Sequence, residues 1–139
     1  MNFKKLVMGG IAGGVAFFLL GWIIYGMLLM NFMTSHPGTV GGIERAEPDF
    51  LYLIIGNLAM GFLFACILVK SNVNNLSSGL ITGGIVGLLM AVGVDSTMYA
   101  TTNIISKTAM AADVAAMTVM SAIVGAIIGL IVGMGKKIA

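Results

Sequence analysis

Residues 79–103 read GLITGGIVGLLMAVGVDSTMYATTN, and this stretch decides the fold. It is almost entirely apolar and long enough for the roughly 20 residues that a helix needs to cross a bilayer. Three further stretches have the same character, at about 6–30, 50–69 and 111–134. We therefore expect an all-α membrane protein, a four-transmembrane-helix bundle that forms a single membrane domain over residues 1–139.

The composition agrees with a lipid environment. Of the 139 residues, 59% are hydrophobic and 9% are charged, and the mean hydropathy is +1.09. A water-soluble domain carries about a quarter charged residues. The net charge of +2 is too small to indicate a nucleic-acid partner, and the single cysteine, Cys66, excludes an intrachain disulfide. The partner that the composition predicts is the lipid bilayer.

The positions of lysine and arginine predict the orientation, because positive loops stay in the cytoplasm. Only Arg45 and Lys107 fall on one side of the predicted membrane. The other side carries Lys4, Lys5, Lys70, Lys136 and Lys137. We expect a multi-pass protein of the cytoplasmic (inner) membrane with both termini inside and an external loop at about 31–49. The first apolar stretch is too long for the core of a signal peptide, so we expect it to be a retained helix.

Small residues recur every four positions on three of the predicted helices, and on the first of them they are Gly9 and Gly13 beside Gly10 and Gly14. Lipid removes the hydrophobic drive between membrane helices, so close backbone approach has to hold them together. The positions of this glycine zipper are Gly79, Gly83, Gly87, Ser121, Gly125, Gly129 and Gly133. The spacing predicts helix packing and leaves open whether the partner helix belongs to the same chain. It favours a homo-oligomer or a larger membrane complex.

Two segments share a Gly-Gly start followed by an apolar run, AGGVAFFLLGWIIYG at 12–26 and TGGIVGLLMAVGVDS at 82–96. The similarity indicates a weak tandem repeat of two hairpins that run in the same direction. In this register Tyr25 corresponds to Asp95.

Asp95 is a carboxyl inside a predicted membrane helix, about eight residues or roughly 12 Å from its outer end. A carboxylate at such depth costs about 2–3 kcal/mol on insertion scales unless it is paired or protonated, and no lysine or arginine lies in this layer. Two interpretations follow: a structural hydrogen-bonding group, or a proton or cation site. The other helices place polar groups at similar depth, namely Asn57, Tyr25, Trp22, Thr118 and Ser121.

Near the outer end of the first helix, thioether and imidazole side chains recur every three residues, at Met27, Met30, Met33 and His36. These groups suit Cu(I), but in an α-helix a three-residue step drifts around the axis. The four side chains would converge only if the helix end tightened into a 3₁₀ turn. We therefore expect no metal and no cofactor. At the start of the fourth helix we expect Asp113 to complement the helix dipole.

Catalytic motifs are missing from the sequence, which has no P-loop, no HExxH and no G-x-S-x-G. The single histidine and the single cysteine lie near opposite faces of the predicted membrane, so they cannot form a dyad. We do not expect an enzyme.

Three segments carry a family resemblance, GWIIYG at 21–26, NLAMGFLFACIL at 57–68 and GLITGGIVGLLMAVGV at 79–94. Together they resemble the bacterial membrane proteins of domain-of-unknown-function family 1761. The resemblance implies a small bacterial four-helix protein, and it brings no activity or site residue with it.

The pattern as a whole favours a non-catalytic accessory or assembly subunit that associates through its glycine-rich helix faces. The alternative is a small oligomeric proton- or cation-coupled transporter or channel that uses Asp95 together with Asn57 and Tyr25.

Overall fold

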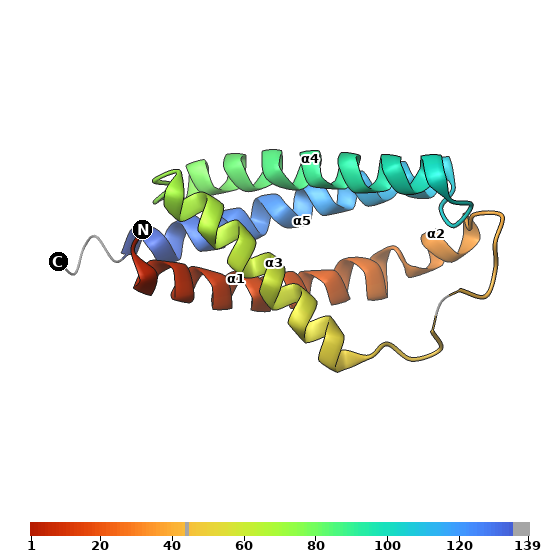
Figure 1. Ribbon diagram of the computed structural model, residues 1–139, viewed down its shortest axis with the longest axis horizontal. Coiled ribbons are helices and arrows are strands. Elements are labelled where there is room, and N and C mark those ends of the chain that lie inside the picture. The colour runs from red at the N-terminus through yellow and green to blue at the C-terminus, as the bar shows by residue number, and fades with distance from the viewer. Residues whose placement is uncertain (44, 135–139) are drawn as a thin grey trace.

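The computed structural model describes residues 1–43 and 45–134, and all regular structure in them is helical (Figure 1). The elements are α1 (Phe3–Ile23), the π-helical turn η1 (Ile24–Leu28), α2 (Met30–Ser35), α3 (Phe50–Lys70), α4 (Leu76–Thr101) and α5 (Lys107–Met134). Four stretches are long and apolar enough to cross a membrane, namely Phe3–Leu28, Phe50–Lys70, Leu76–Thr101 and Lys107–Met134. The predicted all-helical architecture with four candidate membrane spans is confirmed.

These segments form helices because lipid offers no partners to the backbone, so each N–H and C=O must be satisfied within its own segment. The N–H groups of the first turn have no acceptor within the helix. At each long helix, the side chain of a polar residue accepts a hydrogen bond from one of them. The capping bonds run from Lys5 N to Asn2 (3.3 Å), Leu51 N to Asp49 (3.2 Å), Ser78 N to Asn75 (2.9 Å) and Ala109 N to Ser106 (3.1 Å). The caps therefore set where each span begins.

The helices pack as two antiparallel pairs, α1 with α3 and α4 with α5 (Figure 1). Helix α5 joins the pairs, because it also packs against α1 and α3. Helix α3 crosses α1 obliquely, and its Phe50 end leads away from the rest of the bundle (Figure 1). The start of α1 and the end of α5 lie at the same end of the bundle.

Large side chains fill the core between α1, α3 and α5. Phe17 and Phe64 meet edge to face with ring centroids 5.0 Å apart, and Leu68, Val124 and Ile128 are fully buried around them. Helix α4 contributes differently, since its buried residues are Gly79, Gly83, Gly87, Ala91 and Asp95. It is therefore held mainly by backbone contact, and its partly buried Val86 and Met90 pack against the core.

The α4–α5 seam is this backbone contact. Gly83 packs on Gly125, where an added Cβ would lie 2.8 Å from the Gly125 Cα, and Gly87 packs on Ser121. Gly79 packs on Gly125 and Gly129, so each four-residue step along α4 is matched by a four-residue step back along α5. The small residues predicted to pack helices thus join two helices of one chain.

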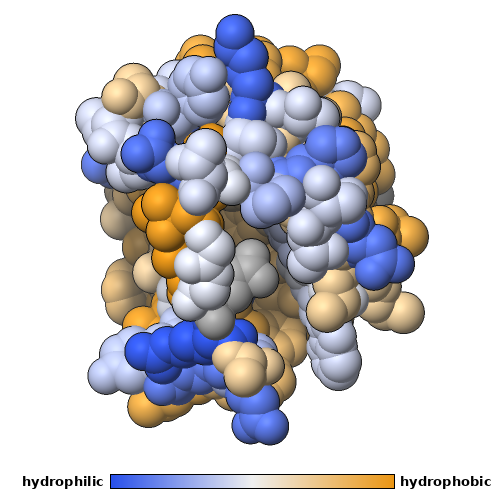
Figure 2. Space-filling model, turned by 90° about the vertical axis from the view of Figure 1, so that its right-hand side faces the viewer, coloured by the Kyte–Doolittle hydropathy of each residue, from blue (hydrophilic) through white to orange (hydrophobic). Residues whose placement is uncertain are grey.

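The two ends of the bundle differ in charge. The lysine end carries Lys4, Lys5 and Lys70. At the opposite end, called here the loop end, residues 36–40 fold onto the α4–α5 connection at 102–106. The Thr39 N–H donates to the Asn103 carbonyl at 2.9 Å, and the Ser106 hydroxyl donates to the His36 carbonyl at 2.7 Å. Figure 2 looks onto this end and shows polar side chains gathered over it, with apolar side chains around its edge.

Candidate functional site

Asp95 lies opposite Asp113 across the α4–α5 seam. Two further four-residue steps beyond the contact of Gly87 with Ser121 bring these two carboxyl groups together. The Asp113 carboxyl lies near both the Asp95 carboxyl and the Tyr25 hydroxyl. Tyr25, Asp95 and Asp113 therefore form one cluster, called here the carboxyl cluster, that draws on three elements of the fold.

Asp95 is the most enclosed member of the carboxyl cluster. Its side chain is 6% exposed, whereas Tyr25 and Asp113 are half-buried. Among the side chains that the structure describes, two buried polar atoms have no hydrogen-bond partner, Oδ2 of Asp95 and Oγ of Ser121. Buried polar atoms are nearly always satisfied, so an unpartnered carboxylate oxygen inside a membrane span calls for an explanation.

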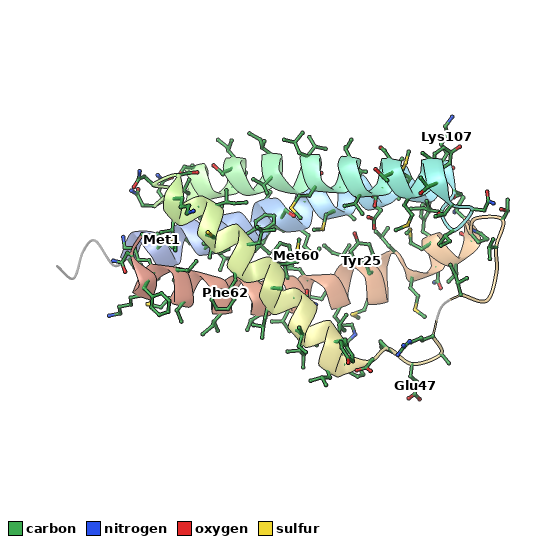
Figure 3. All side chains as sticks on the ribbon, in the orientation of Figure 1. Met1, Tyr25, Glu47, Met60, Phe62 and Lys107 are labelled. Atoms are coloured by element: carbon green, nitrogen blue, oxygen red, sulfur yellow. The ribbon has the colours of Figure 1, made fainter. Side chains whose placement is uncertain are left out.

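Tyr25 is positioned by the π-helical turn η1. The turn is closed by the bond from the Leu29 N–H to the Ile24 carbonyl, at 2.7 Å. A π turn inserts one extra residue and so rotates the helix face beyond it, and such turns are frequent at functional sites. Figure 3 shows Tyr25 lying between α1 and the α4–α5 pair.

Asp113 was expected to serve the helix dipole at the start of its helix, and the structure places it elsewhere. Helix α5 begins at Lys107, because Ser106 provides the capping oxygen. Asp113 consequently lies in the second turn, beyond the first turn in which the dipole acts. The sequence signal that points to this is the polar residue Ser106 just before the apolar run, a typical N-cap.

The remaining polar groups of the predicted layer do not join the carboxyl cluster. Trp22 is 62% exposed on the outer surface. The Asn57 amide donates to the Leu53 carbonyl at 2.7 Å, within its own helix, and the Thr118 hydroxyl donates to the Val114 carbonyl at 2.6 Å. Ser121 is fully buried in the seam, eight residues from Asp113 and so about 12 Å along α5. Of the predicted set, only Tyr25 and Asp95 meet.

The arrangement needed for a copper site at the end of the first helix is not formed. The side chains of Met27, Met30, Met33 and His36 would converge only in a tightened 3₁₀ turn. The chain instead forms the wider π turn η1. Met27 and Met30 are 68% and 56% exposed, and Nδ1 of His36 lies 2.9 Å from the Phe32 carbonyl oxygen. Within residues 1–43 and 45–134, no three His, Cys, Asp or Glu side chains group to hold a metal.

The carboxyl cluster has a definite chemistry. Two carboxylates that face each other repel, so the pair is stable when it shares a proton or holds a cation between its oxygens. Lys107 does not neutralise it, since it is exposed and six residues from Asp113, about 9 Å along the axis. The salt bridge formed within the described chain joins Arg45 to Asp49 at the loop end, at 3.9 Å.

Comparison of the chain with protein-family models, with curated proteins and with solved structures finds no match. The resemblance to domain-of-unknown-function family 1761 therefore stays a prediction, and the function has to be argued from the carboxyl cluster.

Proposed function

We propose that this protein is a small carrier or channel that moves protons or monovalent cations across the cytoplasmic membrane through the carboxyl cluster. The observation that carries the proposal is the buried Oδ2 of Asp95, which has no partner in the described chain and faces the second carboxyl of Asp113. A carboxyl that only joins helices would have its oxygens satisfied by neighbouring donors. An intramembrane carboxyl that lacks them is typical of ion and proton pathways.

The placement of the cluster supports a path from the loop end. Asp95 is six residues from the end of α4 at Thr101, and so about 9 Å from it along the helix. The positive lysine end favours a cytoplasmic location for both termini. Lys136 and Lys137, which contribute to that expectation, lie outside the described residues. In this orientation the carboxyl cluster lies in the outer half of the membrane.

Reconstitution of the purified chain into proteoliposomes tests the proposal. Proton entry is followed with an entrapped pH dye under a potassium diffusion potential, and sodium entry is followed with an entrapped sodium dye. We expect flux of one of these ions in the wild type and its loss in Asp95→Asn, because the amide cannot bind a proton or a cation in the same way. Tyr25→Phe should slow the flux without abolishing it.

Glu47→Gln is the matched control, because it also removes one carboxylate but from the exposed external loop. It should leave the flux unchanged. Equal flux in the wild type and in Asp95→Asn, or no flux of either ion in the wild type, would show that the carboxyl cluster does not transport ions.

A second candidate function, an accessory subunit that docks on other membrane proteins or on a second copy, is favoured by one observation. The first six residues of α3, Phe50 to Ile55, are all between 42% and 70% exposed, so this helical segment buries no face against the chain. The glycines of the α4–α5 seam already contact each other's helix within the chain, so they are not available to a partner. The docking face of this second candidate function is therefore on α3.

Gly56 tests this second function, because an added Cβ there meets nothing within 4 Å. Gly56→Leu should release a partner that co-purifies in mild detergent, or should dissociate a homo-oligomer. Gly93→Leu, at an equally open position on α4, should have no such effect. Retention of the partner by both variants would count against docking on α3.

A further inference from the structure

A cavity of about 450 Å³ opens at the lysine end, where Met1 lies in Figure 3. It is formed where the start of α1 meets the turn between α3 and α4. The polar side chains in its wall are two lysines and three asparagines, namely Asn2, Lys5, Lys70, Asn72 and Asn74. All five carry N–H donors, and the two lysines bring positive charge.

No carboxylate opposes these lysines in the wall of the cavity, as far as the described chain forms it. The sequence explains this, because residues 1–43 and 50–94 contain no aspartate or glutamate. Lys5 is half-buried and so is held at the cavity rather than extended into water. Lys70 is exposed at the rim of the cavity. The cavity therefore combines positive charge with amide donors, which is the chemistry that recognises a phosphate group.

The remaining wall is apolar and lies at the edge of the membrane-spanning region. Met1, Val69, Val73 and Val132 contribute it, and Lys70 is the last residue of the span Phe50–Lys70. Val69 is partly exposed, whereas Val73 and Val132 are buried in the core. With Phe50–Lys70 as a membrane span, the cavity lies at the depth of the lipid headgroups. A free phosphate ion would use only the polar half of the wall.

We propose that this cavity binds a phosphate-bearing anion, the headgroup of an anionic phospholipid. The lysines contact the phosphate, the asparagines donate to its oxygens, and Val69 packs on the adjoining lipid carbons. Basic pockets between membrane helices at the cytoplasmic side bind lipid headgroups in this way. Leu76, next to the cavity, is 19 residues from Asp95, about 28 Å along α4, and the site does not depend on the function proposed for the carboxyl cluster.

Titration of the full-length chain in mild detergent with dioleoyl phosphatidylglycerol, followed by native mass spectrometry, tests the proposal. Dioleoyl phosphatidylcholine serves as the zwitterionic comparison, and inorganic phosphate is titrated separately. We expect phosphatidylglycerol to bind more tightly than phosphatidylcholine. Lys5→Gln and Lys70→Gln should each weaken its binding about fivefold, as expected for one lysine near a lipid phosphate.

Lys4→Gln is the matched control, because Lys4 neighbours Lys5 at the same end of the bundle but does not line the cavity. It should leave phosphatidylglycerol binding unchanged. A third outcome is that inorganic phosphate binds, that Lys5→Gln abolishes this binding, and that the two lipids bind equally. The cavity would then be an anion site for free phosphate. Equal weakening by Lys4→Gln and Lys5→Gln, or no preferential binding of either anion, would overturn the proposal.

Discussion

Asp95 on α4 and Asp113 on α5 face each other two helical turns beyond Gly87 and Ser121, where the ladder of small residues between the two helices ends. The two features are physically linked. The glycines of the α4–α5 seam allow the helix backbones to touch, and helices in such contact stay close over the next two turns. Side chains that would stand apart in a wider helix pair are thus held together. The seam therefore fixes the geometry of the carboxyl cluster.

Because the two carboxyl groups are close, their replacement should be strongly non-additive. Asp95→Asn removes the repulsion and gives the partner carboxyl an amide donor, so we expect stability to be unchanged or raised. A double-mutant cycle with Asp113→Asn should show a coupling of about 0.5–3 kcal/mol, as for other groups in direct contact. The free energy of unfolding in mixed detergent micelles measures this coupling.

The control cycle pairs Asp95→Asn with Glu47→Gln, which changes an exposed carboxylate in the loop between α2 and α3. These two changes should add within about 0.5 kcal/mol, as distant sites do. Additive behaviour of the Asp95 and Asp113 variants as well would mean that the two carboxyl groups do not interact.

The α4–α5 seam should not tolerate one extra methyl group at Gly83. A Cβ there would press on the Ser121 carbonyl and lie 2.8 Å from the Gly125 Cα, and backbone cannot move aside as a side chain can. We expect Gly83→Ala to lower the free energy of unfolding by about 1–3 kcal/mol, the usual cost of overpacking. Denaturation of the purified protein in mixed micelles gives this value.

Gly93→Ala provides the matched comparison on the same helix, because nothing lies within 4 Å of its added Cβ. That variant should keep the stability of the wild type or gain up to about 1 kcal/mol, since alanine favours helix over glycine. Similar losses at Gly83 and Gly93 would show that helix flexibility, and not the α4–α5 seam, makes glycine necessary.

The sequence predicts much of this fold, because the length of an apolar run and the four-residue spacing of small residues are local properties. Asp95 and Tyr25 are likewise visible as polar groups at one depth. Asp113 was missed as a member of the cluster, since its role depends on where α5 begins. Ser106 sets that point, and its hydroxyl also bonds to the His36 carbonyl, 70 residues away in the chain.

The outward direction of Trp22 and the separation of Asn57 from the cluster were not predictable from depth alone. Depth fixes position along a helix axis, whereas the direction of a side chain depends on the rotation and tilt of the helix. Here the π turn η1 changes the rotation next to Tyr25, and the oblique crossing of α3 carries its first half away from the bundle. Both are consequences of packing between helices.

The crossing of α3 over α1 should depend on Gly61 as the α4–α5 seam depends on Gly83. An added Cβ would lie 2.6 Å from the Gly14 Cα and against the Gly10 carbonyl. Gly61→Ala is expected to lower the free energy of unfolding by about 1–3 kcal/mol. Gly56→Ala, five residues earlier on α3 and in open space, should not. A loss at Gly56 equal to that at Gly61 would contradict the crossing described here.

Ser106 should control the order of the loop end, because one hydroxyl makes two contacts there. Its oxygen accepts from the Ala109 N–H at 3.1 Å, and its hydrogen goes to the His36 carbonyl at 2.7 Å. Ser106→Ala removes an N-cap, which costs about 1 kcal/mol, and also releases the loop from α5. Amide exchange should then speed up at Ala109 and at Thr39, whose N–H bonds to the same connection.

Ser77→Ala is the matched change for Ser106→Ala, since Ser77 is an exposed serine in the first turn of α4. It should leave the exchange of both amides unchanged. If Ser106→Ala accelerates Ala109 but not Thr39, the hydroxyl caps α5 without holding the loop, and the contact with His36 has no energetic weight. If neither amide responds, α5 does not owe its early start to Ser106.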